Sequence, residues 1–76
     1  MKKKIKNKTY NTKTGIHVAY HLAGRGDTKI CESLYHTLDG NYFLHGRGGS
    51  LTKWNGGEDI VALTVPQAEE WRNKYE

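Results

Sequence analysis

Apolar and polar residues alternate most clearly in the stretch from residue 16 to residue 22. Ile16, Val18, Tyr20 and Leu22 take every second position, with histidine or alanine between them. A period of two is typical of a β-strand. Because the turn-rich residues 11–15 come just before it, residues 4–10 are predicted to form a first short strand that folds back onto this one.

A second hairpin is predicted around the Asp39-Gly40 pair, with residues 29–37 and 41–45 as its arms. Asp-Gly is a strong hairpin signal, either as a two-residue type I′ turn or as a type I turn followed by a glycine bulge. We favour the bulge, which places Leu34 opposite Leu44. The two-residue turn would shift this register by one residue.

In either register both faces of this hairpin carry large apolar side chains, whereas a sheet covered on one side normally alternates apolar and polar residues. A second layer therefore has to cover each face. The candidates are the loop around Trp54, a strand at residues 60–63, the C-terminal helix, and a second copy of the chain or another partner.

The clearest local signal is a helix start near the C-terminal end. Thr64 and Gln67 have the spacing of a capping box, and Pro66 stands in the first turn, where its missing N–H does no harm. A helix is predicted over residues 65–74. Ala68, Trp71 and Tyr75 then share one face, and Trp71 is interpreted as a core residue packed on the sheet.

These elements together predict an α+β fold, a small antiparallel sheet of four to five strands with one C-terminal helix packed on it. We expect residues 9–76 to form a single small domain, preceded by residues 1–8 as a basic flexible arm or a first edge strand. A chain of 76 residues buries only about 60% of the surface of its unfolded form, so the core must be small.

The charge is distributed unevenly along the chain. Residues 1–26 contain seven basic residues and no acid, whereas residues 57–76 contain five acids and two basic residues. A basic arm can attract nucleic acid or an acidic protein, but it can equally be a solvated terminus or a partner for the chain's own acidic helix. The lone Cys31 and the lack of a long apolar run favour a cytoplasmic protein with no membrane contact.

The glycine-rich segment at residues 46–50 does not match a phosphate-binding motif. It lacks the G-x-x-x-x-G-K-[ST] pattern, and it is followed by residues that form helices poorly, so it does not fit a dinucleotide loop either. We interpret it as an omega-like turn whose glycines adopt positive φ or allow close backbone crossings.

No pattern in the chain indicates catalysis or metal binding. His17 and His21 lie too far apart on a strand to share one ion, and His36 and His45, although on adjacent arms, lack further ligands at a recognisable spacing. Cys31 has no neighbouring base and is interpreted as a small buried apolar residue. We therefore expect no catalytic residue, no metal and no cofactor, and we predict that the protein is not an enzyme.

Several strings of residues resemble a family of small proteins encoded by bacterial phages and integrative elements. The strings are Thr9-Tyr10-Asn11-Thr12, Leu34-Tyr35-His36-Thr37, Gly40-Asn41-Tyr42-Phe43-Leu44-His45-Gly46, Gly48-Gly49, and Leu63-Thr64 with Trp71. The chain departs from the family pattern at Arg47 and at Val65-Pro66, where acids are usual. The resemblance implies a mobile-element accessory protein, and proteins of this kind often inhibit host defence by stoichiometric binding, as anti-CRISPR proteins do.

We therefore expect non-enzymatic binding of a host protein or ribonucleoprotein complex. Eight residues are the predicted contacts: Arg47, Lys53, Tyr42, Lys2, Lys3, Lys4, Lys6 and Lys8. The alternative is a small basic nucleic-acid-binding protein, because aromatic residues on a sheet can stack on bases while lysine and arginine contact phosphates. A homodimer is a further candidate assembly.

Overall fold

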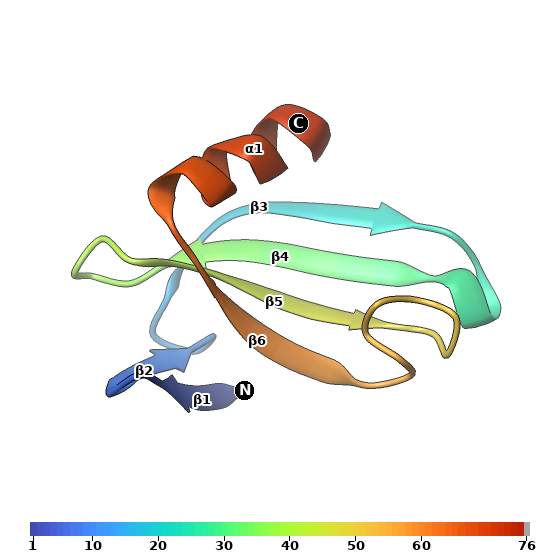
Figure 1. Ribbon diagram of the computed structural model, residues 1–76, viewed down its shortest axis with the longest axis horizontal. Coiled ribbons are helices and arrows are strands. Elements are labelled where there is room, and N and C mark those ends of the chain that lie inside the picture. Colours follow the sequence, from blue (N-terminus) through green and yellow to red (C-terminus); the bar gives the residue numbers. More distant parts are fainter. Residues whose placement is uncertain (76) are drawn as a thin grey trace.

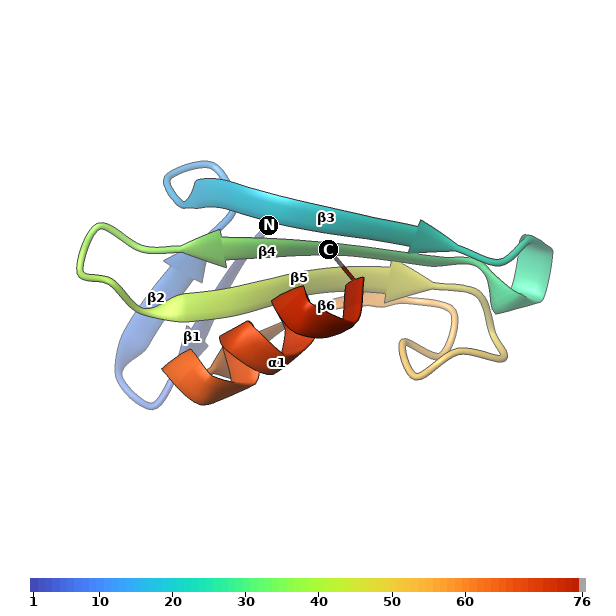
Figure 2. The same ribbon diagram turned by 90° about the horizontal axis from the view of Figure 1, so that it is seen from above.

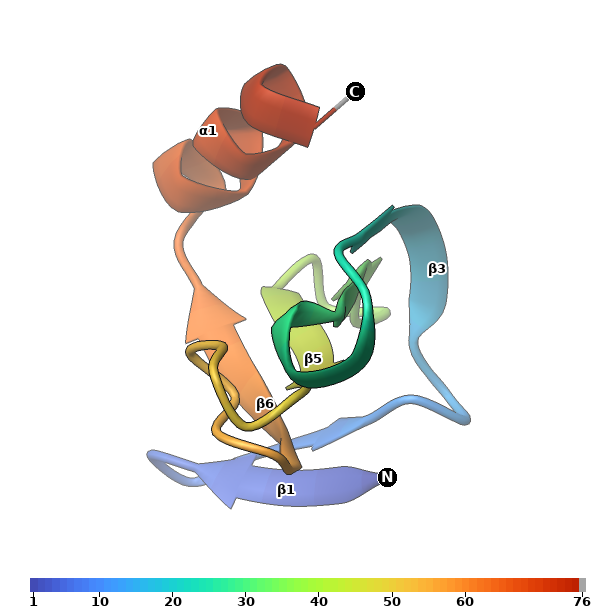
Figure 3. The same cartoon turned by 90° about the vertical axis from the view of Figure 1, so that its right-hand side faces the viewer.

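The computed structural model describes residues 1–75 and confirms the α+β fold (Figure 1). Four antiparallel strands form a sheet in the order β3-β4-β5-β6, and two further strands form a separate hairpin, β1-β2. The elements are β1 (Lys2–Ile5), β2 (Lys8–Asn11), β3 (Ile16–Ala23), η1 (Gly26–Thr28), β4 (Ile30–His36), β5 (Tyr42–Gly48), β6 (Glu58–Leu63) and α1 (Val65–Tyr75). Seen along the sheet in Figure 3, α1 lies on one side and the β1-β2 hairpin on the other.

The β4-β5 hairpin has the predicted bulged register, with Leu34 opposite Leu44. The amide of Gly40 donates to the carbonyl of Thr37 at 3.0 Å, and Gly40 has a φ of +84°. This is a type I turn followed by glycine in the left-handed region, which a residue with a side chain adopts only at a cost. The turn sequence therefore determined the register.

The helix begins as predicted. The backbone N–H of Gln67 donates to Thr64 Oγ1 at 3.3 Å, and the backbone N–H of Thr64 donates to Gln67 Oε1 at 2.9 Å. This reciprocal pair satisfies two amides that have no partner inside the helix. Ala68 and Trp71 are buried against the sheet, which confirms the predicted core face of the helix.

Two small cores lie on opposite faces of the sheet. On the helix side, Leu34 and Leu44 pack against Ala68 and Trp71. On the other side, Phe43 and Ile60 pack against Tyr10 from β2, and Phe43 is fully buried. The two-sided apolar pattern of the β4-β5 hairpin is thus covered by the helix on one face and by the N-terminal hairpin on the other.

The prediction of a single strand at residues 4–10 paired with residues 16–22 was wrong. These residues form parts of β1 and β2, which pair with each other, Ile5 opposite Lys8. Lys6 and Asn7 between them have φ values of +49° and +67°. Positive φ at both central residues is the mark of a tight two-residue hairpin turn, and the sequence signal for it is weak because glycine is absent here.

Within residues 1–75, no helix has the length and apolar character needed to cross a membrane.

Candidate functional site

The most unusual polar group in the molecule is the carboxylate of Glu32, in the middle of β4. It points to the helix side of the sheet and is buried, with only 2% of the residue exposed. The indole Nε1–H of Trp71 donates to Oε1 at 3.0 Å, and that of Trp54 donates to Oε2 at 3.0 Å. Lys53 Nζ lies 2.8 Å from Oε2 and completes the cluster with an ion pair. A buried carboxylate is tolerated only when its oxygens are satisfied in this way.

Burial by itself would raise the pKa of Glu32, because it penalises the charged form. Hydrogen bonds from Lys53, Trp71 and Trp54, together with the positive charge of Lys53, outweigh burial and hold the pKa below its ordinary value of 4.5. Glu32 is therefore ionised at neutral pH and accepts hydrogen bonds from fixed donors. An anion fully engaged by protein donors connects structural elements, and it is not placed to remove a proton from a substrate.

Two glycines of the 46–49 segment allow close contacts, and Gly46 does so within this cluster. A Cβ on Gly46 would overlap the indole ring of Trp54, and one on Gly49 would overlap the backbone of Asp27. Neither glycine has a positive φ. Of the two reasons given for glycine from the sequence, close approach is confirmed here and positive φ is not.

The predicted turn at these residues is wrong in position, because β5 continues through Gly48 and the chain turns after it. The amides of Gly48, Gly49 and Gly56 donate to carbonyls within the protein, at 2.9 to 3.2 Å. They are engaged in holding the loop together, so they are not directed at a bound phosphate.

The opposite face of the sheet is covered over only part of its area. The β1-β2 hairpin packs on Phe43, Tyr35 and Ile60, and the rest of this face carries no second layer. We call this uncovered part the open half-face. It consists of Tyr20 and Leu22 on β3, Lys29, Cys31 and Ser33 at and along β4, His45 and Arg47 on β5, and Glu58 on β6.

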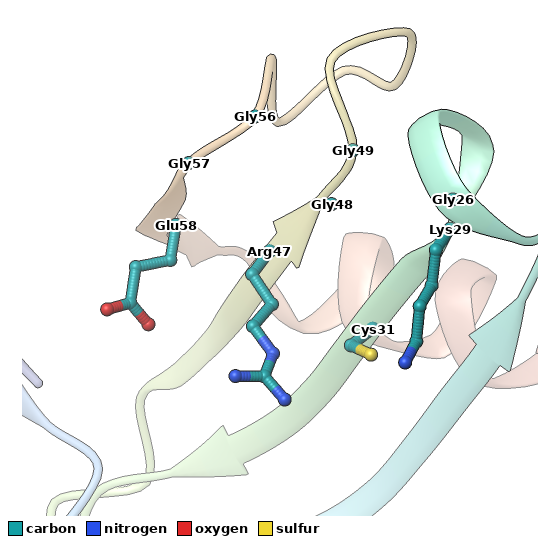
Figure 4. Close-up of a pocket in the computed structure, with 9 residues that line it drawn as sticks. All are labelled: Gly26, Lys29, Cys31, Arg47, Gly48, Gly49, Gly56, Gly57 and Glu58. Carbon is teal, nitrogen blue, oxygen red and sulfur yellow. The ribbon is translucent and has the colours of Figure 1, made fainter.

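Two shallow hollows, of about 480 and 260 Å³, indent the open half-face and share Cys31 and Arg47. Figure 4 shows Lys29 just before β4, Cys31 on β4 and Arg47 on β5, with their side chains lining the same hollow. Tyr20 is 64% and Leu22 is 59% exposed. The surface therefore combines cations with an exposed aromatic and an exposed aliphatic side chain.

The charges of the open half-face do not cancel one another. Glu58 Oε2 lies 2.9 Å from His45 Nε2, so the one acid of this surface already has a partner. Among residues 1–75, the side chains of Arg47 and Lys29 have no hydrogen bond or ion pair. Two cations of this surface therefore have no counter-ion among the described residues.

The residues predicted as contacts do not come together in one place. Arg47 lies on the open half-face, whereas Lys53 lies on the helix side and is bound to Glu32. Tyr42 is half-buried against the core of the helix side, with its ring edge-on to His36.

The predicted lysines all belong to the β1-β2 hairpin and its turn, which packs on the same side of the sheet as the open half-face. Lys3 Nζ lies 2.7 Å from Asp59 Oδ1, and Lys8 Nζ donates to Asn41 Oδ1 at 3.2 Å. Lys2, Lys4 and Lys6 are exposed. The hairpin therefore adds positive charge to this side of the molecule, but two of its lysines already have partners.

Of the open half-face, only Arg47 was predicted as a contact from the sequence, and Tyr20, Leu22 and Lys29 were not among the predicted contacts. The signal that could have found them is strand parity. Leu22 lies opposite Cys31, which lies opposite Arg47, so these three residues form one row on one face.

No group of histidine, cysteine and acidic residues within residues 1–75 is arranged to hold a metal ion. His36 and His45 lie on opposite faces of the sheet, because His36 shares its face with Leu34 and His45 is opposite Ser33. Cys31 has a free thiol and is only partly buried, so its interpretation as a buried apolar residue was wrong.

Comparison with protein-family models, with curated proteins and with solved structures finds no match to this chain. The candidate function therefore rests on the residues and on the structure.

Replacing Glu32 by glutamine should destabilise the protein by about 2–3 kcal/mol at pH 7, because the ion pair with Lys53 and the charge on the acceptor are lost. The pH dependence should change as well. Because folding lowers the pKa of Glu32, its contribution is full above about pH 4.5 and is lost as the pH falls through the folded-state pKa.

Urea unfolding between pH 2 and 7 measures this difference. The pKa of Asp59 is also lowered, by hydrogen bonds from Lys3 and from the backbone of Ile60. Both proteins should therefore lose some stability in acid for this second reason. The gap between wild type and Glu32→Gln should narrow as the pH falls. A gap that stays constant over this range would contradict the role assigned to the Glu32 charge.

Replacing Gly46 by alanine should destabilise the protein by about 1–3 kcal/mol, because the new Cβ displaces the indole of Trp54 from its place beside Glu32. Gly57→Ala is the matched control, since its Cβ would come no closer than 3.7 Å to the carbonyl oxygen of Trp54. Thermal unfolding and tryptophan fluorescence compare the two variants. Equal stability of both would show that Trp54 does not need the bare backbone of Gly46.

Proposed function

We propose that the protein is a non-enzymatic binding protein that captures an acidic host protein through the open half-face. The observation that carries the proposal is the presence of two unpaired cations, Arg47 and Lys29, beside the exposed side chains of Tyr20 and Leu22 on an uncovered sheet face. Sheet faces in small proteins are normally covered or polar.

The composition of this surface suits a protein partner. Arginine and tyrosine are enriched among the residues that contribute most to protein interfaces, and burying an exposed aromatic and an exposed leucine provides hydrophobic driving force. The cations would provide orientation and faster association with an acidic surface. The hollows beside Arg47 and Cys31 give the surface relief that a partner can fit, and the carboxylate of Glu32, which lines one of them, is already engaged by Trp54, Trp71 and Lys53.

The resemblance to small phage and mobile-element proteins supports a more specific form of this proposal. Proteins of that kind often inhibit a host defence machine by occupying its working surface, in the manner of anti-CRISPR proteins. A rigid sheet face that combines charged and apolar groups is compatible with such stoichiometric occlusion. The proposed place of action is the cytoplasm of the bacterial host.

The double variant Arg47→Glu with Lys29→Glu should reduce affinity for the partner at least tenfold, since two attractive contacts become repulsive. The measurement is quantitative mass spectrometry of proteins captured from a bacterial host lysate, followed by a binding titration with the protein identified. Both substitutions are on exposed side chains, so the circular dichroism spectrum should not change.

Lys13→Glu with Lys74→Glu is the matched control, because it changes the net charge equally through exposed side chains outside the open half-face. Lys53 is unsuitable for this test, since Lys53→Glu would place a second carboxylate against Glu32. Equal loss of one captured protein in both double variants would mean that net charge, and not the open half-face, governs binding.

Direct binding of nucleic acid is the second candidate, favoured by the position of Tyr20 near unpaired cations and by the lysines of the hairpin on the same side. Phosphate contacts release counterions, so the affinity should fall steeply as salt concentration rises. Electrophoretic mobility shift with single-stranded and duplex DNA and RNA tests it. An absence of any shift at low salt would eliminate this candidate and leave the protein partner.

A further inference from the structure

We propose that β3 pairs antiparallel with β3 of a second copy of this chain, so that two four-stranded sheets join into one sheet of a dimer. The inference concerns an edge of the sheet and does not depend on the function proposed for the open half-face. It rests on three observations: the exposure of this edge, the residues that form it, and the register that they allow.

The first observation is that β3 is an outermost strand. It pairs with β4 on one side only, and in Figure 2 its other long side is covered neither by α1 nor by the β1-β2 hairpin. Every second residue of an edge strand directs its N–H and C=O away from the sheet, and these groups can pair with another strand. The edge is a ready template for strand addition.

The second observation is that β3, beyond its bulge at residues 17–19, carries none of the side chains that usually protect an edge. Its sequence, IHVAYHLA, contains no lysine, arginine, aspartate or glutamate, and it contains no proline. Natural edge strands commonly carry lysine or proline that blocks pairing. The opposite edge strand, β6, shows the contrast, because it begins with Glu58 and Asp59 and Asp59 is held by Lys3 of the hairpin.

The third observation is the register. β3 has a bulge between His17 and Ala19, so its regular part is the five residues from Ala19 to Ala23, with His21 at the centre. A two-fold axis through that centre places His21 opposite His21 of the second copy. It also forms two equivalent pairs, in each of which Tyr20 of one copy lies opposite Leu22 of the other. Aromatic and aliphatic cross-strand pairs stabilise a sheet, and here they would cover the two largest exposed apolar groups of β3 after the bulge.

The same features favour a second copy over another segment. The edge offers no cation to attract an acidic peptide, and no charged side chain has to lose its water when two copies of β3 meet. The segment Ala19–Ala23 is complementary to itself under a two-fold axis, which is the commonest symmetry of homodimers. In the dimer, the open half-faces of both copies would form one continuous surface, because Tyr20 and Leu22 belong to each.

Sedimentation velocity from low micromolar to millimolar concentration tests the dimer. Wild type should shift from monomer to dimer, and Leu22→Lys should weaken the dimer at least tenfold, because it places a charge in the pairing edge. Leu38→Lys is the control, since Leu38 is 84% exposed in the β4-β5 turn, away from this edge. A wild type that stays monomeric at every concentration overturns the proposal.

Oxidative cross-linking tests the register, and it does so even if the Leu22→Lys variant fails to fold. In a Cys31→Ser background, His21→Cys should form a disulfide-linked dimer rapidly, because directly opposed residues have Cα atoms about 5 Å apart. Ala23→Cys should not, since the two copies of residue 23 would be offset by four residues, about 13 Å. Failure of His21→Cys to cross-link, or equal cross-linking of both variants, overturns this register.

Discussion

The structure depends on one ion, the buried carboxylate of Glu32. Removing a carboxylate from water costs several kcal/mol unless its oxygens find fixed donors. Here one oxygen is bound by the indole of Trp71, and the other by the indole of Trp54 and by Lys53. These donors come from the helix and from the loop after β5. If either element left the sheet, the carboxylate would lose hydrogen-bond donors that it needs while buried. The ion therefore holds the helix, the loop and β4 together.

This arrangement explains which side chains of the molecule are used for folding and which remain exposed. Both tryptophans and Lys53 are committed to Glu32, and the helix side of the sheet is consequently a structural face. A chain of 76 residues has few large apolar side chains left for a second layer. The short N-terminal hairpin covers only the part of the other face around Phe43. The remaining area, with Arg47, stays open to solvent and is the surface that we propose for binding.

The open half-face and the free edge of β3 meet along one strand. Tyr20 and Leu22 face outward on the sheet surface, while the backbone of the same residues belongs to the unpaired edge. A binding surface on a rigid sheet is preorganised, because its side chains are held by strand pairing and not by a mobile loop. Association of two copies along this edge would enlarge that surface without any change within each copy.

The sequence by itself determined the features whose causes lie within a few residues. The Asp39-Gly40 turn established the β4-β5 register, and the Thr64 and Gln67 caps established the start of the helix. Only the tertiary structure decided which residues share a site. It placed Lys53 and Arg47, six residues apart, on opposite faces, and it brought Glu32 between two tryptophans 22 and 39 residues away. Local hydrogen bonds are formed by residues close in sequence and can be recognised from the sequence, whereas a buried charge depends on donors that only the folded chain brings together.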